Sequence, residues 1–327
     1  MKVLTELLDF PFWVRFKLYE VGFLPRKNLP KPSISIGSLT IGGAGKTPMT
    51  EFLAKTLIKM GLRPGIITIG YGRKSKGLVV LHGPPENWLI SGDEPAMLAQ
   101  NLPNTPIAIH KNRKLAAEAI KDEVDVYILD DAFQNICTKR DLDILMLTCK
   151  EAKTAIFPFG LRRDTIWRLR EIDKNKAIAI AKKGRDCQYM KKFFRHIFTF
   201  ETTPELIFNI KNPEINFDIN WINGKKVYLT AGIANPERFA ESMLKCGASI
   251  IGHKWFLDHR LYRPAQVKRV VRKAKKLGAE VILTTQKDAV RIKAFAPENM
   301  FAVKIALKIE PHDDFIRLIK EFMSKLL

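Results

Sequence analysis

The chain has 327 residues and a formal net charge of +21, from 55 Lys and Arg against 34 Asp and Glu. At about 150 residues per domain this length predicts two domains, and a hydrophobic content of 46% is sufficient for a packed core. No apolar run reaches the roughly 18 residues of a membrane-spanning helix, and the start of the chain lacks the pattern of a secretory signal. We therefore expect neither a spanning helix nor a cleaved signal.

A positive charge of this size predicts an anionic partner, such as nucleic acid, phospholipid headgroups or a phosphorylated substrate. A lysine-rich surface of the kind found in thermophiles would also account for it, and composition does not choose between the two.

The four cysteines are scattered and form no C-x-x-C pair. A chain without such spacing is typical of a cytosolic protein with unpaired thiols. We predict that all four are reduced and mostly buried, and they are Cys137, Cys149, Cys187 and Cys246.

Residues 1–30 differ from the rest of the chain because they are dense in Leu, Phe and Trp. Phe12 and Trp13 stand next to the basic residues Arg15 and Lys17. Aromatic and cationic side chains on one segment are typical of a helix in a membrane interface. The pattern also suits an N-terminal helix that packs on its own domain, and both interpretations can hold for different faces. We predict an amphipathic, membrane-associating segment that ends in a proline-rich linker.

Beyond this segment, short apolar runs alternate with helical patterns. This alternation predicts an α/β fold, with a mostly parallel sheet and helices on both of its faces. A stretch rich in Asn, Pro and Glu at 202–223 predicts the connection between a first domain, 31–205, and a smaller C-terminal α/β domain, 206–327. Strands are predicted at 33–36, 66–69, 107–109, 126–129, 144–147, 177–181, 227–230, 281–285 and 301–305, and helices from Pro48, from Pro236, over 264–277 and at the C-terminus.

A glycine-rich loop follows the first predicted strand and reads Gly37-Ser-Leu-Thr-Ile-Gly-Gly-Ala-Gly-Lys-Thr47. The order strand, glycine loop, Lys-Thr and helix is that of a P-loop, whose main-chain N–H groups surround nucleotide phosphates. Lys46 is predicted to bridge the β- and γ-phosphates of ATP, and Thr47 to bind Mg²⁺. The predicted ATP-binding residues are Thr40, which replaces the usual first glycine, Ile41, Gly42, Gly43, Ala44, Gly45, Lys46 and Thr47.

An acidic pair closes the predicted strand at 126–129. An apolar strand that ends in a carboxylate is the Walker B pattern, which holds Mg²⁺ directly or through water. A turn or a helix cap produces the same pattern, but the P-loop upstream favours the metal. The predicted metal ligands are Thr47, Asp130 and Asp131.

Local sequence gives weaker signals elsewhere. Asp93 precedes a helical run, where it is most simply a helix cap. His259 follows Asp258 in a predicted loop, where a histidine is most often an ordinary surface residue. Basic residues cluster around Arg73 and around Arg163, where they bind phosphate or simply face solvent.

Taken in order, the motifs resemble those of the tetraacyldisaccharide 4'-kinase family, the lipid A 4'-kinases. The chain departs from the family's usual residues at four positions, with Ile69 for Arg, Ala132 for Gly, Asn135 for His and Asp164 for Glu. The matching segments are Ser35-Ile-Gly-Ser-Leu-Thr-Ile-Gly-Gly-Ala-Gly-Lys-Thr-Pro48, Gly70-Tyr-Gly-Arg-Lys-Ser-Lys-Gly77, Gly92-Asp-Glu-Pro95, Leu129-Asp-Asp-Ala-Phe-Gln134, Ala231-Gly-Ile-Ala-Asn-Pro-Glu-Arg-Phe239, Asp258-His259 and Thr284-Thr-Gln-Lys-Asp288.

The resemblance implies two α/β/α domains with a cleft between them. It implies a Mg²⁺-dependent enzyme that transfers the γ-phosphoryl group of ATP to the 4'-hydroxyl of a tetraacylated glucosamine disaccharide 1-phosphate. It also implies peripheral association with the cytoplasmic face of the inner membrane. Asp93 is implied as the catalytic base, assisted by His259, with Lys46 as a further catalytic residue. The substrate-binding residues predicted with it are Arg73, Asn112, Arg113, Gln134, Arg163 and Asp164.

We therefore predict a lipid-sugar kinase of lipid A biosynthesis, whose partners are the acylated disaccharide phosphate and an anionic membrane surface. The alternative is a P-loop NTPase switch or cofactor-assembly protein, which would lack steady turnover with a lipid acceptor. A nucleic-acid-stimulated ATPase is a second rival, but the positive charge is spread along the chain and no nucleic-acid module is recognisable. No nucleic-acid partner is expected.

Overall fold

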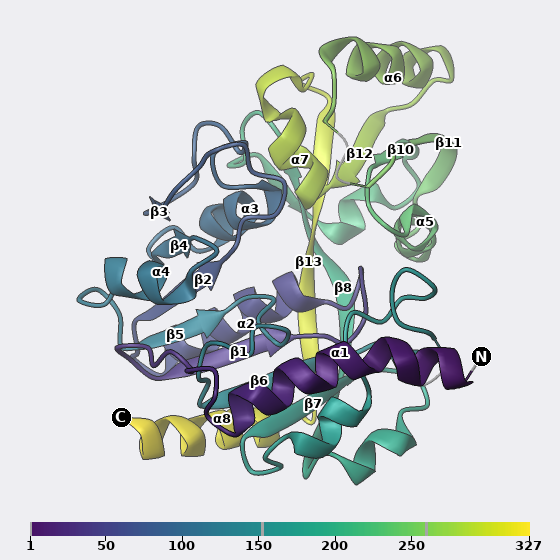
Figure 1. Cartoon of the computed structure of the whole chain (residues 1–327). Coiled ribbons are helices and arrows are strands. Elements are labelled where there is room, and N and C mark those ends of the chain that lie inside the picture. The colour runs from purple at the N-terminus through teal and green to yellow at the C-terminus, as the bar shows by residue number, and fades with distance from the viewer. Residues whose placement is uncertain (1, 152–153, 259–260) are drawn as a thin grey trace.

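The computed structural model describes residues 2–151, 154–258 and 261–327. The strands of this part of the chain form one mostly parallel sheet in the order β11-β10-β12-β13-β8-β7-β6-β1-β5-β2-β4-β3, with β9 beside β8. Two lobes meet along the long antiparallel pair β8–β13 (Figure 1). The strands are β1 Ser33–Gly37, β2 Pro64–Thr68, β3 Val79–Leu81, β4 Ile107–Ile109, β5 Val126–Leu129, β6 Leu142–Leu147, β7 Ala177–Lys182, β8 His196–Asn209, β9 Asn216–Asp218, β10 Lys226–Ala231, β11 Ser249–Trp255, β12 Val281–Thr285 and β13 Met300–Glu310.

Helices cover both faces of the sheet in the first lobe. Side chains of β5 alternate between the faces, so that Val126 and Ile128 pack with α2, α3 and α8, whereas Tyr127 and Leu129 pack with α4. The α/β class predicted from the sequence is confirmed. The α-helices are α1 Lys2–Glu20, α2 Lys46–Lys59, α3 Asp93–Asn101, α4 Arg113–Ala119, α5 Pro236–Lys245, α6 Pro264–Lys276, α7 Gln286–Ile292 and α8 His312–Leu326, and the short 3₁₀ helices are η2 Trp167–Glu171, η3 Gln188–Lys192, η4 Ile219–Ile222 and η5 Lys293–Phe295.

The stretch predicted to connect the domains, 202–223, contains regular structure, because β8 continues through its first part and β9 and η4 lie within it. From Thr199 to Asn209, β8 is paired with β13, which is about a hundred residues further along the chain. Pro204, which suggested a linker, lies beside an irregularity in the register with β13 and so costs the ladder little. Pairing with a distant strand leaves no mark in the local pattern.

The end of the chain returns to the first lobe. Phe315 of α8 is fully buried in the core that also contains α2, and its ring centroid lies 5.2 Å from that of Phe198. The domain boundary at residue 205 remains a prediction. α8 belongs to the predicted C-terminal domain by sequence, but it packs on the first domain.

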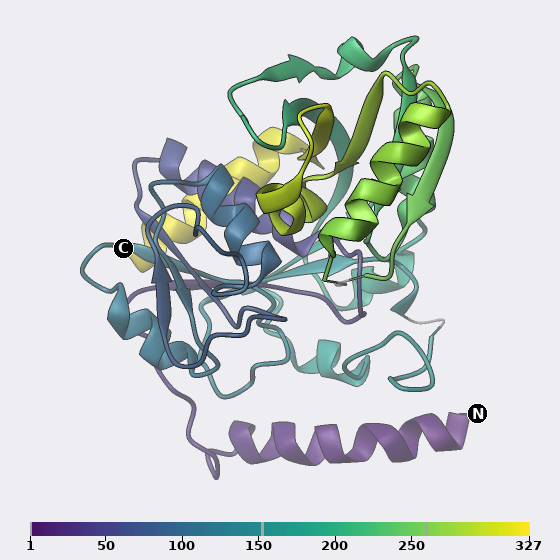
Figure 2. The ribbon, with the colours of Figure 1, turned by 90° about the horizontal axis from the view of Figure 1, so that it is seen from above.

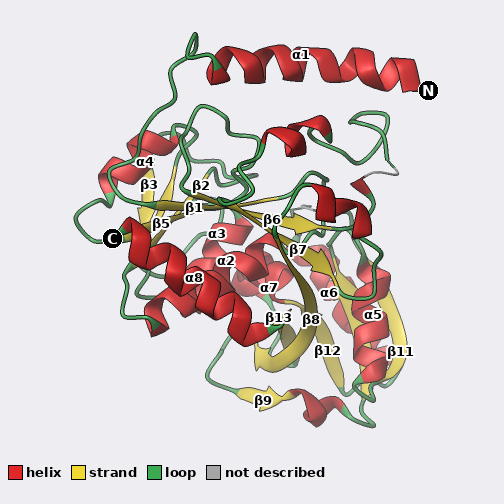
Figure 3. Ribbon diagram, turned by 90° about the horizontal axis from the view of Figure 1, so that it is seen from below, coloured by secondary structure: helices red, strands yellow, loops and turns green. Residues whose placement is uncertain are grey.

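α1 lies along the outside of the first lobe, on the side opposite the second lobe (Figures 2 and 3). Phe16 is buried against η2, where its ring centroid is 5.7 Å from that of Trp167. On the same helix Phe10 is 61% exposed and Trp13 is 41% exposed. Phe16 therefore packs on the protein, as the structural interpretation of this segment expects, and association of the exposed rings with a membrane remains a prediction. No helix in the described ranges is long and apolar enough to span a membrane.

Candidate active site

The P-loop connects β1 to α2 through a backbone that requires glycine. Gly42, Gly43 and Gly45 have φ values of +71°, +57° and +83°, in the left-handed region. At Gly45 a side chain would also meet the ring of Phe200, 2.9 Å from the position of a Cβ. Thr40 stands where the usual first glycine would be, and its backbone does not adopt the left-handed conformation. Its hydroxyl lies 3.5 Å from that of Thr148. The loop retains the shape that directs main-chain N–H groups toward an anion.

Lys46, the first residue of α2, points back across this loop. Its Nζ lies 3.3 Å from Ser38 Oγ and 3.7 Å from Asp131 Oδ1. Asp131 also accepts two hydrogen bonds from Arg163, at 2.8 and 2.6 Å. Burial raises the pKa of the Asp131 carboxyl, but the Arg163 hydrogen bonds and the Lys46 charge outweigh it and lower this pKa below its ordinary value. Two cations therefore converge on one carboxylate at the end of β5.

Asp130 faces the other way and is buried. Its oxygens accept hydrogen bonds from Thr50, at 3.0 Å, and from Thr68, at 3.3 Å. Burial, with the negative charges of Glu94 and Asp131, raises the pKa of the Asp130 carboxyl to about 6. The site thus holds an anion without a cationic partner of its own in the described structure.

Oxygen ligands suitable for Mg²⁺ meet beside Asp130. Thr47 Oγ1 donates to Glu94 Oε2 at 3.2 Å, and the charge of Glu94 acts on Asp130. The described residues contain no closed cluster of three or more acidic, His or Cys side chains for a metal. Mg²⁺ bound together with nucleotide phosphates needs only one or two carboxylates, since the phosphates and water complete its shell. The donor set fits this ion, and the uncompensated charge of Asp130 is one that a cation would stabilise.

The second lobe closes over this site through α7, which packs against α3. Lys287 donates to Glu94 at 3.0 Å, and Gln286 and Asn101 exchange hydrogen bonds at 2.7 and 3.2 Å. Asp258, which precedes α6, lies 3.9 Å from Lys287. Glu94, which accepts the hydroxyl of the P-loop threonine, therefore also accepts a hydrogen bond from the second lobe.

Asp93, the predicted catalytic base, is buried at the start of α3 and pairs with Arg291 of α7. The Arg291 Nε lies 2.7 Å from Asp93 Oδ2, and its second terminal nitrogen also donates to that oxygen. The main-chain N–H of Glu94 donates to Asp93 Oδ1 at 2.9 Å. Arg291 in turn contacts Asp288 and the carbonyl of Gly232. His259, predicted to assist Asp93, lies outside the described residues.

Three of the predicted substrate residues support the corner after β5. Arg113 is buried and donates to three main-chain carbonyls, those of residues 67, 130 and 131. Gln134 donates to the carbonyl of Ser38 at 2.9 Å. Asp164 is buried in an ion pair with Arg168. These contacts fix the backbone beneath the P-loop and the acidic pair.

Two other predicted substrate residues, Arg73 and Asn112, lie near the end of β4. Arg73 donates to the carbonyls of Ile109, at 3.1 Å, and Gly77, at 2.7 Å. Asn112 precedes α4 and contacts His110 through its main-chain N–H. Their assignment to substrate binding remains a prediction.

Sequence reasoning missed Glu94, Lys287 and Arg291 as site residues. Glu94 and Lys287 belong to the motif segments 92–95 and 284–288. Their neighbours in these motifs are the signal that could have identified them. Arg291 had no such signal, because its partner Asp93 is 198 residues away.

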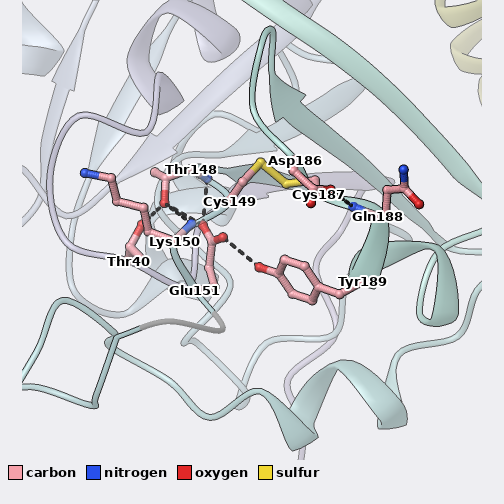
Figure 4. The surroundings of a disulfide bond; sticks show 9 residues. All are labelled: Thr40, Thr148, Cys149, Lys150, Glu151, Asp186, Cys187, Gln188 and Tyr189. Atoms are coloured by element: carbon pink, nitrogen blue, oxygen red, sulfur yellow. Dashed lines mark hydrogen bonds between the residues drawn. A yellow bond between two sulfur atoms is a disulfide. The ribbon is translucent and has the colours of Figure 1, made fainter.

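The prediction that all four cysteines are reduced is wrong. Cys149 and Cys187 form a disulfide, with their Cα atoms 5.2 Å apart, whereas Cys137 and Cys246 are free. Figure 4 shows the bond beside Glu151, which accepts hydrogen bonds from Thr148 and from the Tyr189 hydroxyl. β6 and η3 bring the two cysteines together across 38 residues of sequence, a separation from which pairing cannot be read.

Comparison with known proteins agrees with this geometry. Residues 1–324 match the model of the family described as tetraacyldisaccharide-1-P 4'-kinase. A tetraacyldisaccharide 4'-kinase of Desulfotalea psychrophila is 35% identical over 303 residues, which are 87% of this chain and 85% of that protein. One from Haemophilus influenzae is 29% identical over 323 residues, 96% of this chain and 91% of that protein.

Among solved structures, LpxK from Aquifex aeolicus in complex with ATP matches with a TM-score of 0.78 and 27% identity. The match covers 98% of this chain and 97% of that one. The likeness extends over both lobes and the site between them, and the chain belongs to the tetraacyldisaccharide-1-phosphate 4'-kinase family.

Proposed function

We propose that this chain transfers the γ-phosphoryl group of ATP to the 4'-hydroxyl of a tetraacyldisaccharide 1-phosphate, with Mg²⁺, on a membrane surface. The observation that carries the proposal is the contact between Thr47 of the P-loop and Glu94, next to Asp93. It supports the proposal because Asp93, the proposed base for the hydroxyl group, lies one residue from Glu94, the partner of the P-loop threonine. A P-loop that served only as a switch would not need such a base.

The reaction then follows from the positions of the side chains. The N–H groups of the P-loop and Lys46 hold the phosphates, so that Lys46 exchanges Asp131 for the nucleotide as its partner. The 4'-oxygen attacks the γ-phosphorus, a new P–O bond forms, and the bond to the β–γ bridging oxygen breaks to release ADP. The proton of the hydroxyl passes to the carboxylate of Asp93, which Arg291 holds in place.

Mg²⁺ would be held by Thr47 and Asp130, with Glu94 and Asp131 beside them. When bound, the ion neutralises charge on the phosphates during transfer. Asp130 is suited to this role because Thr50 and Thr68 fix its oxygens in a buried position.

The membrane contact is assigned to α1, on the cytoplasmic face of the inner membrane, where ATP is available. Phe10 and Trp13 are exposed on this helix, and the cations Arg15 and Arg26 are exposed at or near it. Each cation close to an anionic bilayer contributes about 1 kcal/mol to binding. Vesicles of phosphatidylglycerol should retain the full chain better than a variant that lacks residues 1–24, and equal retention would leave α1 with its structural role alone.

The deciding experiment is a transfer assay with tetraacyldisaccharide 1-phosphate in detergent micelles and ATP labelled at the γ-phosphate. We expect label in the lipid product, and none when the acceptor already carries a 4'-phosphate. Release of labelled inorganic phosphate at a rate independent of the acceptor would instead indicate a nucleotide switch.

A further inference from the structure

A loop between β6 and η2 presents large apolar side chains to solvent. Phe157 is 62% exposed, Phe159 is 66% exposed and Leu161 is 48% exposed. We call residues 157–161 the apolar tip. Three exposed side chains of this size within five residues exceed the single apolar residues that normally occur on a protein surface.

The apolar tip is an ordered turn. Phe157 N donates to the carbonyl of Arg162 at 2.7 Å, Arg162 N donates to that of Ala155 at 3.1 Å, and Phe159 N donates to that of Ile156 at 3.0 Å. Gly160 closes the turn, since a Cβ there would lie 2.3 Å from the carbonyl oxygen of Ala155. The rings are therefore exposed by a fixed backbone, and binding to an apolar medium costs little ordering entropy.

The tip and α1 lie on the same side of the molecule. η2, which follows the tip in the chain, is the element on which α1 packs, through Phe16 and through Lys17, 3.6 Å from Glu171. Figures 2 and 3 show the loop after residue 153 beside the N-terminal part of α1. The side chains of Lys150 and Arg170, on either side of the tip in sequence, are exposed. Exposed apolar rings with exposed cations nearby in the chain are typical of a segment that enters an anionic bilayer.

The base of the tip is hydrogen-bonded to the P-loop. Ile41 N donates to the carbonyl of Leu161 at 2.8 Å, and Arg163 N donates to the carbonyl of Leu39 at 2.7 Å. Thr40 and Arg162 form an isolated β-bridge between these bonds. Whatever holds the tip therefore also fixes the position of the phosphate-binding loop.

We propose that the apolar tip inserts Phe157 and Phe159 into the acyl region of an anionic bilayer, as a second membrane contact beside α1, and so orients the P-loop toward an acceptor that lies in the bilayer. The inference rests on the proposed function for its acceptor, but the contact itself is with the bilayer and can be measured without turnover.

Binding to vesicles is the first test. Phe157→Ser/Phe159→Ser in the full chain should bind phosphatidylglycerol vesicles about ten- to a hundredfold more weakly, because two rings lose their apolar environment. Ile215→Ser/Leu244→Ser, which removes two exposed apolar side chains from the second lobe, should bind as the unchanged chain does. Equal binding by all three would overturn the proposal. So would a tip-dependent dimer in the absence of vesicles, because the rings would then contact a second copy.

Depth of insertion is the second test. Phe159→Cys, labelled with an environment-sensitive dye after Cys137→Ser and Cys246→Ser, should brighten on vesicles and be quenched by quenchers attached to lipid acyl chains. Quenching only by quenchers in water would overturn the proposal. The Ser double variant should keep its transfer rate on acceptor in excess detergent and lose it on acceptor in vesicles. Loss of transfer in detergent by the unchanged chain would count against the proposed function instead, and would leave the insertion result intact.

Discussion

Arg291 of α7 forms a buried ion pair with Asp93 at the start of α3, with 2.7 Å between the Arg291 Nε and Asp93 Oδ2. The side chains of Arg291 and Asp93 are 0% and 3% exposed. The pair joins the two lobes at the residue next to Glu94, which accepts the Thr47 hydroxyl. It therefore links the position of the second lobe to that of the nucleotide site.

Arg291→Met should lower the free energy of unfolding by about 3–5 kcal/mol, since it leaves the charge of Asp93 buried without its partner. We also expect kcat to fall, because Asp93 loses the group that orients it. Urea unfolding and the transfer assay measure the two effects. Arg317→Met is the matched control, because Arg317 pairs with Asp314 on the surface. Unchanged stability in Arg291→Met would show that the interlobe ion pair does not form.

Lys46→Ala should reduce phosphoryl transfer to less than a tenth, with the fold intact, because the γ-phosphate loses its principal cation. Thr47→Ala should reduce the response of the rate to Mg²⁺. Lys55→Ala, on the same helix but paired with Glu51, is the control and should transfer normally. Retention of more than a tenth of the activity by Lys46→Ala would contradict the assignment of the P-loop.

Asp130 makes stability depend on pH, because its pKa is about 6 in the folded chain and the ordinary value is 3.8. A carboxyl with a raised pKa stabilises the fold most below its unfolded pKa, and that contribution is lost as the pH rises through 6. Asp130→Asn has no charge to bury. Without nucleotide or Mg²⁺ it should be more stable than the unchanged chain by about 3 kcal/mol above pH 7, and by roughly half that at pH 5.

Thermal unfolding at both pH values, in the presence of a chelator, measures this difference. Asp125→Asn is the control, because the pKa of Asp125 is lowered by its hydrogen bonds from Arg63 and the sign of its pH dependence is the opposite. A stability difference between Asp130→Asn and the unchanged chain that is the same at both pH values would show that the pKa of Asp130 is not raised in the folded chain.

The parts of the structure predicted from the sequence are those set by local pattern. The strand at 126–129 and the strand at 281–285 coincide with β5 and β12, since each is an apolar run between polar residues. The P-loop could be predicted for the same reason, because its glycines, lysine and threonine follow one another in a fixed order. Such segments carry their own signal.

The parts that could not be predicted depend on contacts between distant residues. The extension of β8 to Asn209 was not predicted, because its partner β13 lies far along the chain. The pairing of Cys149 with Cys187 and that of Asp93 with Arg291 arise only when β6 meets η3 and α3 meets α7. Local sequence favoured a helix cap for Asp93, but the N-cap of α3 is Gly92 and Asp93 is an acidic residue in its first turn. Its ion pair across the lobes is the additional fact that only the fold supplies.

The Cys149–Cys187 disulfide closes a loop of 38 residues in sequence, which in the chain-entropy model stabilises the fold by about 4 kcal/mol. Cys149→Ala/Cys187→Ala should therefore unfold at lower urea concentration under oxidising conditions, and the difference should shrink in a thiol reductant. Cys137→Ser/Cys246→Ser, which removes the two free thiols, should change little. Equal stability of the unchanged chain with and without reductant would show that the bond does not persist in solution.

The assignment of Asp93 as the catalytic base can be separated from its part in the ion pair. Asp93→Asn keeps the size of the side chain and its acceptor for the Glu94 N–H, but it cannot take a proton. Arg291 retains Asp288 at 3.2 Å in this variant, so the loss of stability should be smaller than in Arg291→Met.

If Asp93 takes the proton, Asp93→Asn must have a lower kcat than Arg291→Met even though it has the higher free energy of unfolding. We expect Asp93→Asn to lower kcat by about 10²-fold or more, with ATP affinity unchanged, and to be the slower enzyme although it is the more stable one. His259→Ala should cost less than Asp93→Asn, and the two together should cost less than the sum of their separate effects. An Asp93→Asn enzyme faster than Arg291→Met would leave Asp93 with the ion pair alone, because losing the base would then have cost less than losing its partner.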